Sequence, residues 1–402
     1  MNKRLCLLLV IIFIAVAAVP AWAQEELWKQ HMKAASEGLK QNNTDIAWTA
    51  FQAAIEEAEA FGSEDPRLVS TLELAGGFLG SQGQFVQAES LLRRALSIRE
   101  NASGIDNPEV ADSIDLLAGL YQSQERTDDA EVQLRRSLAI REKAYGNVHP
   151  KVDASLNRLV ALYYTQGKYD AAAPLLKRSL EIREKAKGPD DPIVAAALNE
   201  LGTLYHRQGK LSEAEQLLLR ARNIREKKYG LQHIEVAESA SSLGALYRDQ
   251  GRYQEAERLF MLSMSLRDNL VGKKNPMDPS LAAGLKDLAG VRLVQGKFAE
   301  SQLLLERCLV IEENAAGKED ASLSPTLINL ARVHINQKHY PQAEQLLQRT
   351  LAIQEKSLGR DHVTVAPTLS LLAEVFRNTG RASEADSADA RAKAVLASHP
   401  VK

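Results

Sequence analysis

The chain has 402 residues, with 50 basic and 52 acidic side chains and a formal net charge of -2. This length exceeds one compact core unless the chain is a repeat array or several domains. The near-neutral charge gives no nucleic-acid-binding footprint. Aromatic residues make up only 5% and prolines number 13, while helix-forming residues recur, so the composition favours an all-α class.

The first 23 residues have the pattern of a secretory signal peptide. "MNKR" is basic, "LCLLLVIIFIAVAAV" (5–19) is apolar, and "PAWA" supplies a small-x-small cleavage site that ends at Ala23. A membrane-spanning helix needs about 20 apolar residues, so we expect cleavage after Ala23 and a periplasmic or secreted protein. The alternative is a membrane anchor formed by residues 5–19, and a membrane contact is expected only in that case. The mature chain then has one cysteine, Cys308, which we expect to be a buried structural thiol.

Glycines recur through the rest of the chain at a nearly constant interval of 42 residues, once 45. They are Gly62, Gly104, Gly146, Gly188, Gly230, Gly272, Gly317 and Gly359. Such a period is typical of a solenoid of repeated units. The predicted helical hairpins are 27–61 (degenerate), 69–102, 111–144, 153–186, 195–228, 237–270, 282–315, 324–357 and 366–397.

The unit 195–228 shows why residues of one kind recur at the same position of successive repeats, which we call a column. Apolar residues at helical spacing predict one helix at 195–208 and a second at 212–228, separated by Gly209. Small residues such as Gly202 and Ala214 allow the two helices to approach closely. Gly230 is expected to end the second helix in a left-handed conformation. The insertion 271–280 predicts a longer surface turn, with a hinge or a partner contact as the alternative.

Helix-start signals follow each glycine of the grid. Three residues on, with the insertion allowed for, stand Asp65, Asn107, His149, Asp191, His233, Asp278, Asp320 and His362, often followed by proline. Aspartate or asparagine as N-cap with proline at the first helical position starts a helix. The histidines of this column therefore need no chemical role.

Catalytic and metal-binding patterns are missing from the sequence. No histidine pair has metal-ligand spacing, and the recurring "QGK" lacks the second glycine and the Ser/Thr of a phosphate-binding loop. Paired carboxylates such as Glu312–Glu313 are interpreted as a solvated helix face. We therefore predict that the protein is not an enzyme and has no catalytic residues, metal or cofactor.

Many columns together resemble the tetratricopeptide repeat (TPR) in its 42-residue, kinesin-light-chain-like form. They include the tyrosines Tyr121, Tyr163, Tyr205 and Tyr247, the helix-two alanines such as Ala172 and Ala214, and the turn "QGKY" at 166–169. The resemblance implies a right-handed α-solenoid of about nine helical hairpins over residues 24–398. It also implies a concave groove that binds a protein or peptide partner. A passive spacer in an envelope assembly and a non-catalytic subunit of an enzyme complex are the alternatives.

The residues expected in the groove follow from the resemblance. Helical spacing shows only that they lie outside the apolar stripe of the first helices. They are Asn157, Tyr164, Asn199, His206, Arg207, Arg248, Lys286 and Arg332. Asn157 and Asn199 match the asparagines that hold a peptide backbone in the family. Acidic residues (Glu73, Asp112, Asp115) in the N-terminal repeats and basic ones (Arg248, Lys286, Arg332, Arg377) in the C-terminal repeats predict a ligand with carboxylates toward the C-terminal repeats.

Overall fold

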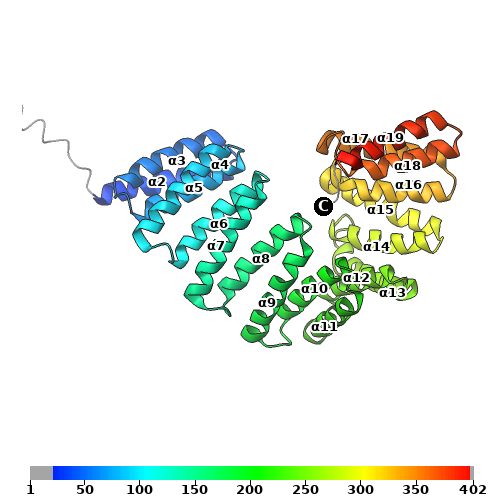
Figure 1. The fold of residues 1–402 in the computed structure, drawn as a ribbon, viewed down its shortest axis with the longest axis horizontal. Helices are drawn as coiled ribbons and strands as arrows, with labels where there is room; N and C mark the ends of the chain where they lie inside the picture. The colour runs from blue at the N-terminus through cyan, green and yellow to red at the C-terminus, as the bar shows by residue number, and fades with distance from the viewer. Residues whose placement is uncertain (1–20, 399–402) are drawn as a thin grey trace, which may run out of the picture. The chain divides into compact units, whose positions relative to one another are not determined.

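The computed structural model describes residues 21–398, and within this range every regular element is a helix. The helices are α2 (Ala21–Lys40), α3 (Thr44–Glu59), α4 (Pro66–Ser81), α5 (Phe85–Ser103), α6 (Pro108–Ser123), α7 (Thr127–Tyr145), α8 (Pro150–Thr165), α9 (Tyr169–Lys187), α10 (Pro192–Arg207), α11 (Leu211–Tyr229), α12 (Ile234–Asp249), α13 (Tyr253–Arg267), η1 (Asp268–Gly272), α14 (Ser280–Val294), α15 (Phe298–Ala316), η2 (Ala321–Leu323), α16 (Ser324–Asn336), α17 (Tyr340–Leu358), α18 (Val365–Asn378) and α19 (Ala382–Ser398). The α-helices follow one another as helical hairpins (Figure 1). The all-α repeat arrangement expected from the sequence is therefore confirmed.

The chain divides into two compact units, Met1–Ala186 and Lys187–Lys402. Within each unit, the second helix of one hairpin packs against the first helix of the next, as α5 does on α6 and α13 on α14. First helices also touch first helices of neighbouring hairpins, as in α4 with α6 and α14 with α16. We call the exposed side of the first helices of a unit its inner face, and the exposed side of the second helices its outer face.

The expected helix caps are present at all eight positions of the cap column. The side chains of Asp65, Asn107, His149, Asp191 and His233 each accept a hydrogen bond from the backbone N–H two residues further on. His149 Nδ1, for example, lies 3.2 Å from Lys151 N. Asp278, Asp320 and His362 accept the same bond from the N–H groups of Ser280, Ser322 and Thr364. The regular α-helix begins later in the last two hairpins, because the short 3-10 turn η2 precedes α16 and α18 begins only at Val365.

The glycines that end the second helices adopt a backbone conformation that differs from the expected left-handed helical one. Gly146 has φ 76° and ψ 170°, and Gly230 has φ 76° and ψ 172°. This region is open almost only to glycine, so the requirement for glycine is stricter than the sequence analysis assumed. The N–H of Gly146 still closes the helix on Glu142 O at 2.9 Å.

Gly272 contradicts its predicted role as a helix terminator. It is buried in η1, a π-helical turn in which Lys273 N donates to Asp268 O at 2.9 Å. The three inserted residues that follow allow the helix to continue by this extra turn. The residues after it, 273–277, are exposed and form surface turns, as the insertion predicted.

The small residues of the first helices set the distance within each hairpin. A Cβ atom on Gly202 would lie 2.8 Å from Leu218 Cγ, and one on Gly244 would lie 2.7 Å from Phe260. These positions therefore exclude larger residues unless the hairpin opens. Cys308 is buried as expected, and burial raises the pKa of its thiol to about 12.

The prediction of a signal peptide falls mainly on residues 1–20, outside the described residues, and its cleavage site lies in the first turn of α2. Between residues 21 and 398 no helix combines the length and the apolar character that a membrane crossing requires.

Candidate protein-binding faces

The predicted groove residues all lie on first helices. Asn157 and Tyr164 are on α8 of the first unit, and the other six are on α10, α12, α14 and α16 of the second. None of the eight is fully buried, whereas the apolar residues beside them, such as Leu156 and Leu198, are. The eight residues thus lie on first helices in both units, and their role in binding stays a prediction.

The two asparagines differ in their surroundings. Asn157 Oδ1 accepts a long hydrogen bond, 3.4 Å, from Ser179 Oγ on α9. Asn199 Oδ1 is closed off from solvent and has no hydrogen-bond partner in the described range 21–398. A buried amide oxygen without a donor costs free energy, about 1–3 kcal/mol. The ring of Tyr164 meets Tyr169 edge-on, with the ring centroids 5.7 Å apart.

Ion pairs inside the protein neutralise most of the predicted basic charges of the second unit. Asp249 binds both His206 Nε2 and Arg248 Nε, each at 2.9 Å. Burial alone would raise the pKa of Asp249, but Arg248 and His206 outweigh it and lower the pKa. Lys286 Nζ binds Glu312 Oε1 at 2.7 Å.

Arg332 is the exception among the predicted cations of α12, α14 and α16. It is exposed and forms no ion pair with any residue that the structure describes. Only its backbone carbonyl is engaged, by Asn336 Nδ2 at 2.8 Å. Its guanidinium therefore remains available to a carboxylate from outside.

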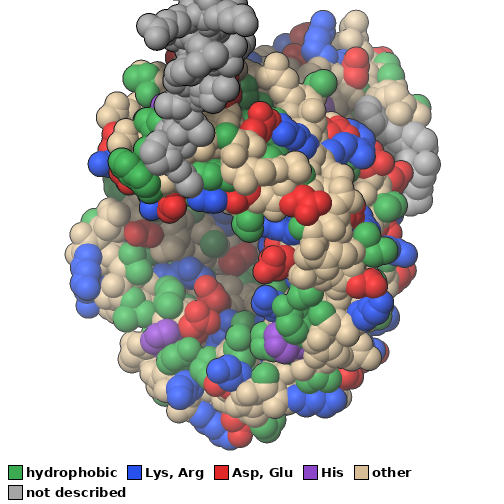
Figure 2. All heavy atoms as spheres, turned by 90° about the vertical axis from the view of Figure 1, so that its left-hand side faces the viewer, with side chains coloured by type: hydrophobic (Ala, Val, Ile, Leu, Met, Phe, Trp, Pro, Cys, Tyr) green, Lys and Arg blue, Asp and Glu red, His purple; other side chains and the backbone are tan. Residues whose placement is uncertain are grey.

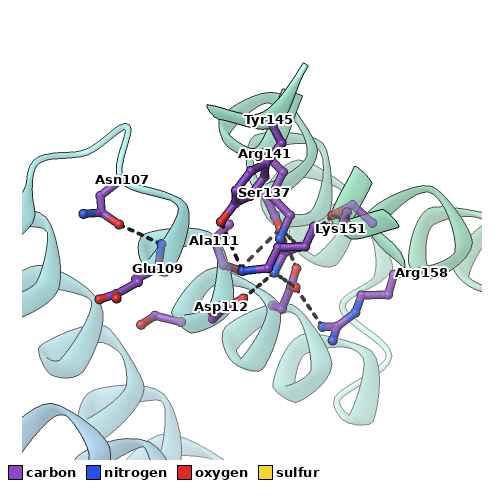
Figure 3. Close-up of polar contacts among 12 residues, drawn as sticks. Asn107, Glu109, Ala111, Asp112, Ser137, Arg141, Tyr145, Lys151 and Arg158 are labelled. Atoms are coloured by element: carbon purple, nitrogen blue, oxygen red, sulfur yellow. Dashed lines mark hydrogen bonds and ion pairs between the residues drawn. The ribbon is translucent and has the colours of Figure 1, made fainter. Parts of the chain in front are cut away.

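The acidic residues of the first unit are neutralised in the same way. Arg141 on α7 binds Asp112 at 2.6 Å and Asp115 at 2.7 Å, while Arg158 reaches Asp115 from α8 at 3.0 Å (Figure 3). Burial alone would lower the pKa of Arg141, but its bonds to Asp115 and Asp112 raise it. Only 3% of the Asp115 side chain is exposed. The predicted acidic groove charges are thus parts of the fold.

This contact repeats along the chain and was missed by the sequence analysis. The second helices carry an arginine row with the 42-residue spacing, namely Arg99, Arg141, Arg183, Arg225 and Arg267. Arg99 binds Glu73 at 2.6 Å, and Arg225 donates to Ser239 of the next hairpin at 2.9 Å. The interval that identified the glycines would also have identified these arginines. On the face of the molecule that Figure 2 shows, basic and acidic side chains are interspersed.

The expectation that Glu312 and Glu313 form a solvated face is wrong. Glu312 takes the place of an arginine in the row and binds Lys286 and Thr326 Oγ1, the latter at 2.6 Å. Glu313 binds Arg349 of the next hairpin at 2.7 Å. Only 12% and 19% of the two side chains are exposed. Both carboxylates connect neighbouring hairpins.

One half-buried carboxyl group of the inner face forms no ion pair with any of the residues that the structure places. Burial raises the pKa of Asp287 on α14 to about 6, although Arg248, Lys286 and Arg267 act in the opposite direction. Two of these cations already bind Asp249 and Glu312. Asp287 is therefore a costly residue for the fold.

Glycines on the inner faces are not required by packing. A Cβ atom on Gly77, Gly119 or Gly290 would meet nothing within 4 Å, in contrast to Gly202 and Gly244. A glycine inside a helix costs about 0.5–1 kcal/mol relative to alanine. Because these positions carry no side chain, the backbone of another protein can approach the inner faces closely.

No arrangement for metal binding was found in the part of the chain that the structure covers, where no group of three or more His, Cys, Asp or Glu side chains could hold an ion. The three histidines of the cap column hold helix starts, and Tyr145 and Tyr229 stack on His149 and His233 with centroids 4.5 and 4.2 Å apart.

Comparisons with known proteins agree with this architecture. The family model described as Tetratricopeptide repeat matches residues 67–143, 151–227, 193–269, 280–356 and 323–398. No curated protein matches the chain significantly. The apo form of the quorum sensor NprR from B. thuringiensis is 16% identical, with a TM-score of 0.60, and the match covers 92% of this chain and 98% of that one.

Two further solved structures are similar to the chain. The apo form of RapI is 18% identical over 72% of this chain and 98% of its own, with a TM-score of 0.51. BtubC (BKLC) from P. vanneervenii is 25% identical over 57% of this chain and 92% of its own, with a TM-score of 0.48. The likenesses to NprR and RapI show the fold.

Proposed function

The chain belongs to the tetratricopeptide-repeat family, and on that premise we propose that it is an exported scaffold whose inner faces bind a segment of another protein. Proteins of this fold usually mediate protein–protein interaction. The main support for the proposal is the set of inner-face glycines Gly77, Gly119 and Gly290. Each makes its helix less stable than alanine would, and no close contact within the protein requires a glycine there.

The buried amide of Asn199 supports the same face. Its oxygen has no donor among the residues that the structure describes, and a rotation of this half-buried side chain would present the oxygen to a peptide N–H. Replacing Asn157 and Asn199 with alanine should weaken binding about 3- to 10-fold for each hydrogen bond lost, because a neutral hydrogen bond contributes about 1 kcal/mol. This loss should be the same at low and high salt.

Steric block of the inner faces tests the function. Gly119→Arg and Gly290→Arg place a long side chain where nothing opposes it, so the helices should persist. Val132→Arg and Leu303→Arg are matched outer-face controls, at side chains that are 63% and 69% exposed. Proteins recovered by residues 24–402 from an envelope extract, identified by mass spectrometry, should be lost with the inner pair and kept with the outer pair. Equal recovery with both pairs would favour a passive spacer held by its other surfaces.

Export is part of the proposal. The basic start, the apolar run 5–19 and the small-x-small site motivate cleavage after Ala23. Trp22 is 75% exposed, whereas Trp28 is anchored by a bond from its Nε1 to Thr71 Oγ1 at 3.0 Å. Cleavage would thus leave the packing of α2 in place. Intact mass of the purified protein should correspond to a chain that begins at Gln24, and a full-length chain in the membrane fraction would support the anchor instead.

A further inference from the structure

The inner face of α16 is unlike that of the other first helices. Ile328 and Ile335 occupy the two positions that are Asp115 and Gln122 on α6, Asn157 and Tyr164 on α8, Asn199 and His206 on α10, and Ser241 and Arg248 on α12. Both isoleucines are half-buried. Arg332 stands between them, four residues after one and three before the other, so the three side chains share one face of the helix.

The neighbouring helix α14 extends this apolar surface. Leu293 is the α14 counterpart of His206, and Val294, the next residue, is 56% exposed. Leu293 packs against a core cluster that contains Leu330 and Val333 of α16, so it lies beside that helix. Gly290, one turn earlier, leaves open space. We call Gly290, Leu293, Val294, Ile328, Arg332 and Ile335 the aliphatic face.

The charges around the aliphatic face favour an acidic ligand. Lys286 is neutralised by Glu312 and Arg377 by Asp389, so both carry little attraction. Glu374, exposed at the position equivalent to Arg332 on α18, makes no ion pair with it. Arg332 is thus an exposed planar cation between two aliphatic side chains of α16, and no residue that the structure describes pairs with its guanidinium.

We propose that the aliphatic face binds an extended segment of the partner protein in which an aliphatic side chain lies within two residues of an aspartate or glutamate. The aliphatic side chain packs on Ile328, Ile335 and Leu293, and the carboxylate pairs with Arg332. This assignment rests on the proposed function, because it takes the inner face as the binding surface and names the chemistry of its ligand.

Peptide display tests the assignment. A random 12-residue library is selected on the chain 24–402, and the enriched peptides are synthesised with amidated C-termini, so that any carboxylate is a side chain. The enriched sequences should share an aliphatic residue next to an acidic one. Arg332→Glu and Ile328→Asp should each raise Kd at least tenfold, and Glu374→Gln should lower it, since a repelling charge is removed.

Arg258→Glu is the matched control. Arg258 is also exposed and, in the described part of the chain, without an ion pair, but it lies on the second helix α13. It should change Kd by less than twofold. Circular dichroism melts establish that the variants fold, and Arg332→Glu, at an exposed site, keeps the test valid if Ile328→Asp unfolds.

The outcomes separate the two proposals. Peptides that bind with Asn199-dependent affinity but ignore Arg332→Glu, or that lack an acidic residue, overturn the aliphatic face and leave the proposed function standing. A concentration-dependent dimer that Arg332→Glu abolishes would assign the face to a second copy of the chain and overturn the proposal too. If no peptide binds either inner face, both proposals are wrong.

Discussion

Single residues with unfavourable backbone conformations mark places where the repeat pattern is not ideal. The turn between the two helices of a hairpin is held by a glycine with positive φ, as at Gly209 and Gly296 (74° and 75°). Glu125 and Lys338 occupy the same turn position with φ of 59° and 61°. A side chain in this region costs about 1 kcal/mol, so these two hairpins carry local strain.

Lys338→Gly should therefore stabilise the protein. We expect a gain of about 0.5–1 kcal/mol, the left-handed penalty less the added freedom of the unfolded chain. The reverse change, Gly296→Lys, is the control and should destabilise by about 1 kcal/mol. Thermal and urea melts of the two variants provide the measurement. A lower melting temperature for Lys338→Gly would mean that the lysine side chain makes a stabilising contact that outweighs its backbone strain.

Asp287→Asn should stabilise the protein at neutral pH. The folded-state pKa of Asp287, about 6, lies above the usual 3.8. Ionisation is therefore harder in the folded state, and stability falls as pH rises from about 4 to about 6. Asparagine removes that cost, so we expect a gain of about 1–2 kcal/mol at pH 7.5 that vanishes near pH 4. A gain of equal size at both pH values would contradict this explanation.

At the scale of helices and hairpins, a polar clasp joins consecutive repeats within each unit. A glutamate of one second helix binds the tyrosine or arginine of the next first helix or turn. Glu89 accepts from Tyr121 Oη at 3.0 Å and Arg126 at 2.8 Å, and Glu215 accepts from Tyr247 Oη at 2.9 Å. Glu257 and Glu344 bind Arg292 and Arg381 in the same way.

The junction between α15 and α16 lacks this clasp. Gln302 replaces the glutamate and His334 replaces the tyrosine. His334 Nδ1 is buried and has no hydrogen-bond partner among the described residues, and the centroids of the His334 and His339 rings lie 5.8 Å apart. Burial and His339 lower the pKa of His334, against the opposing effect of Glu306. Protonation of His334 is therefore less favourable in the folded state than in the unfolded state. The free energy of unfolding falls as pH drops below about 6.5, because the unfolded state binds the proton better.

Restoring the clasp should stabilise this junction. Gln302→Glu with His334→Tyr recreates the Glu215–Tyr247 pair, and we expect about 1 kcal/mol beyond the sum of the single changes. The double variant should also lose less stability than the natural chain between pH 7.5 and 5.5. Hydrogen exchange of α15 and α16 gives a local readout of both effects. A double variant equal to the sum of the single ones would show that no clasp forms.

The helices could be predicted because the residues that start and end a helix act on their immediate neighbours in the sequence. Glycine at a helix end and aspartate before proline act on neighbouring residues, and so the hairpin bounds followed from them. The prediction that Gly272 ends a helix was wrong, because three inserted residues allow a π-helical turn at that place. The candidate site was predicted only as a set of positions. Whether Lys286 or Arg332 is paired depends on distances between helices, which helical periodicity does not contain.

At the scale of the whole molecule, ion pairs inside the repeats leave little free charge on the predicted binding positions. Asp115 and Lys286 contribute to the stacking of hairpins rather than to attraction of a distant ligand. Removing one partner of the buried Arg141–Asp115 pair would cost about 3–5 kcal/mol. Variants that test binding should therefore avoid these residues and use positions that nothing covers.

Site-specific photo-crosslinking in the native host tests the central claim, that a partner binds the inner faces. Benzoylphenylalanine is placed at Ala161 on α8 and Ala283 on α14, both exposed on first helices, and at Val132 and Leu303 on second helices. We expect ultraviolet-dependent adducts with the same partner protein at one or both inner positions and none at the outer positions. Adducts at Val132 or Leu303 alone, with none at Ala161 and Ala283, would contradict it.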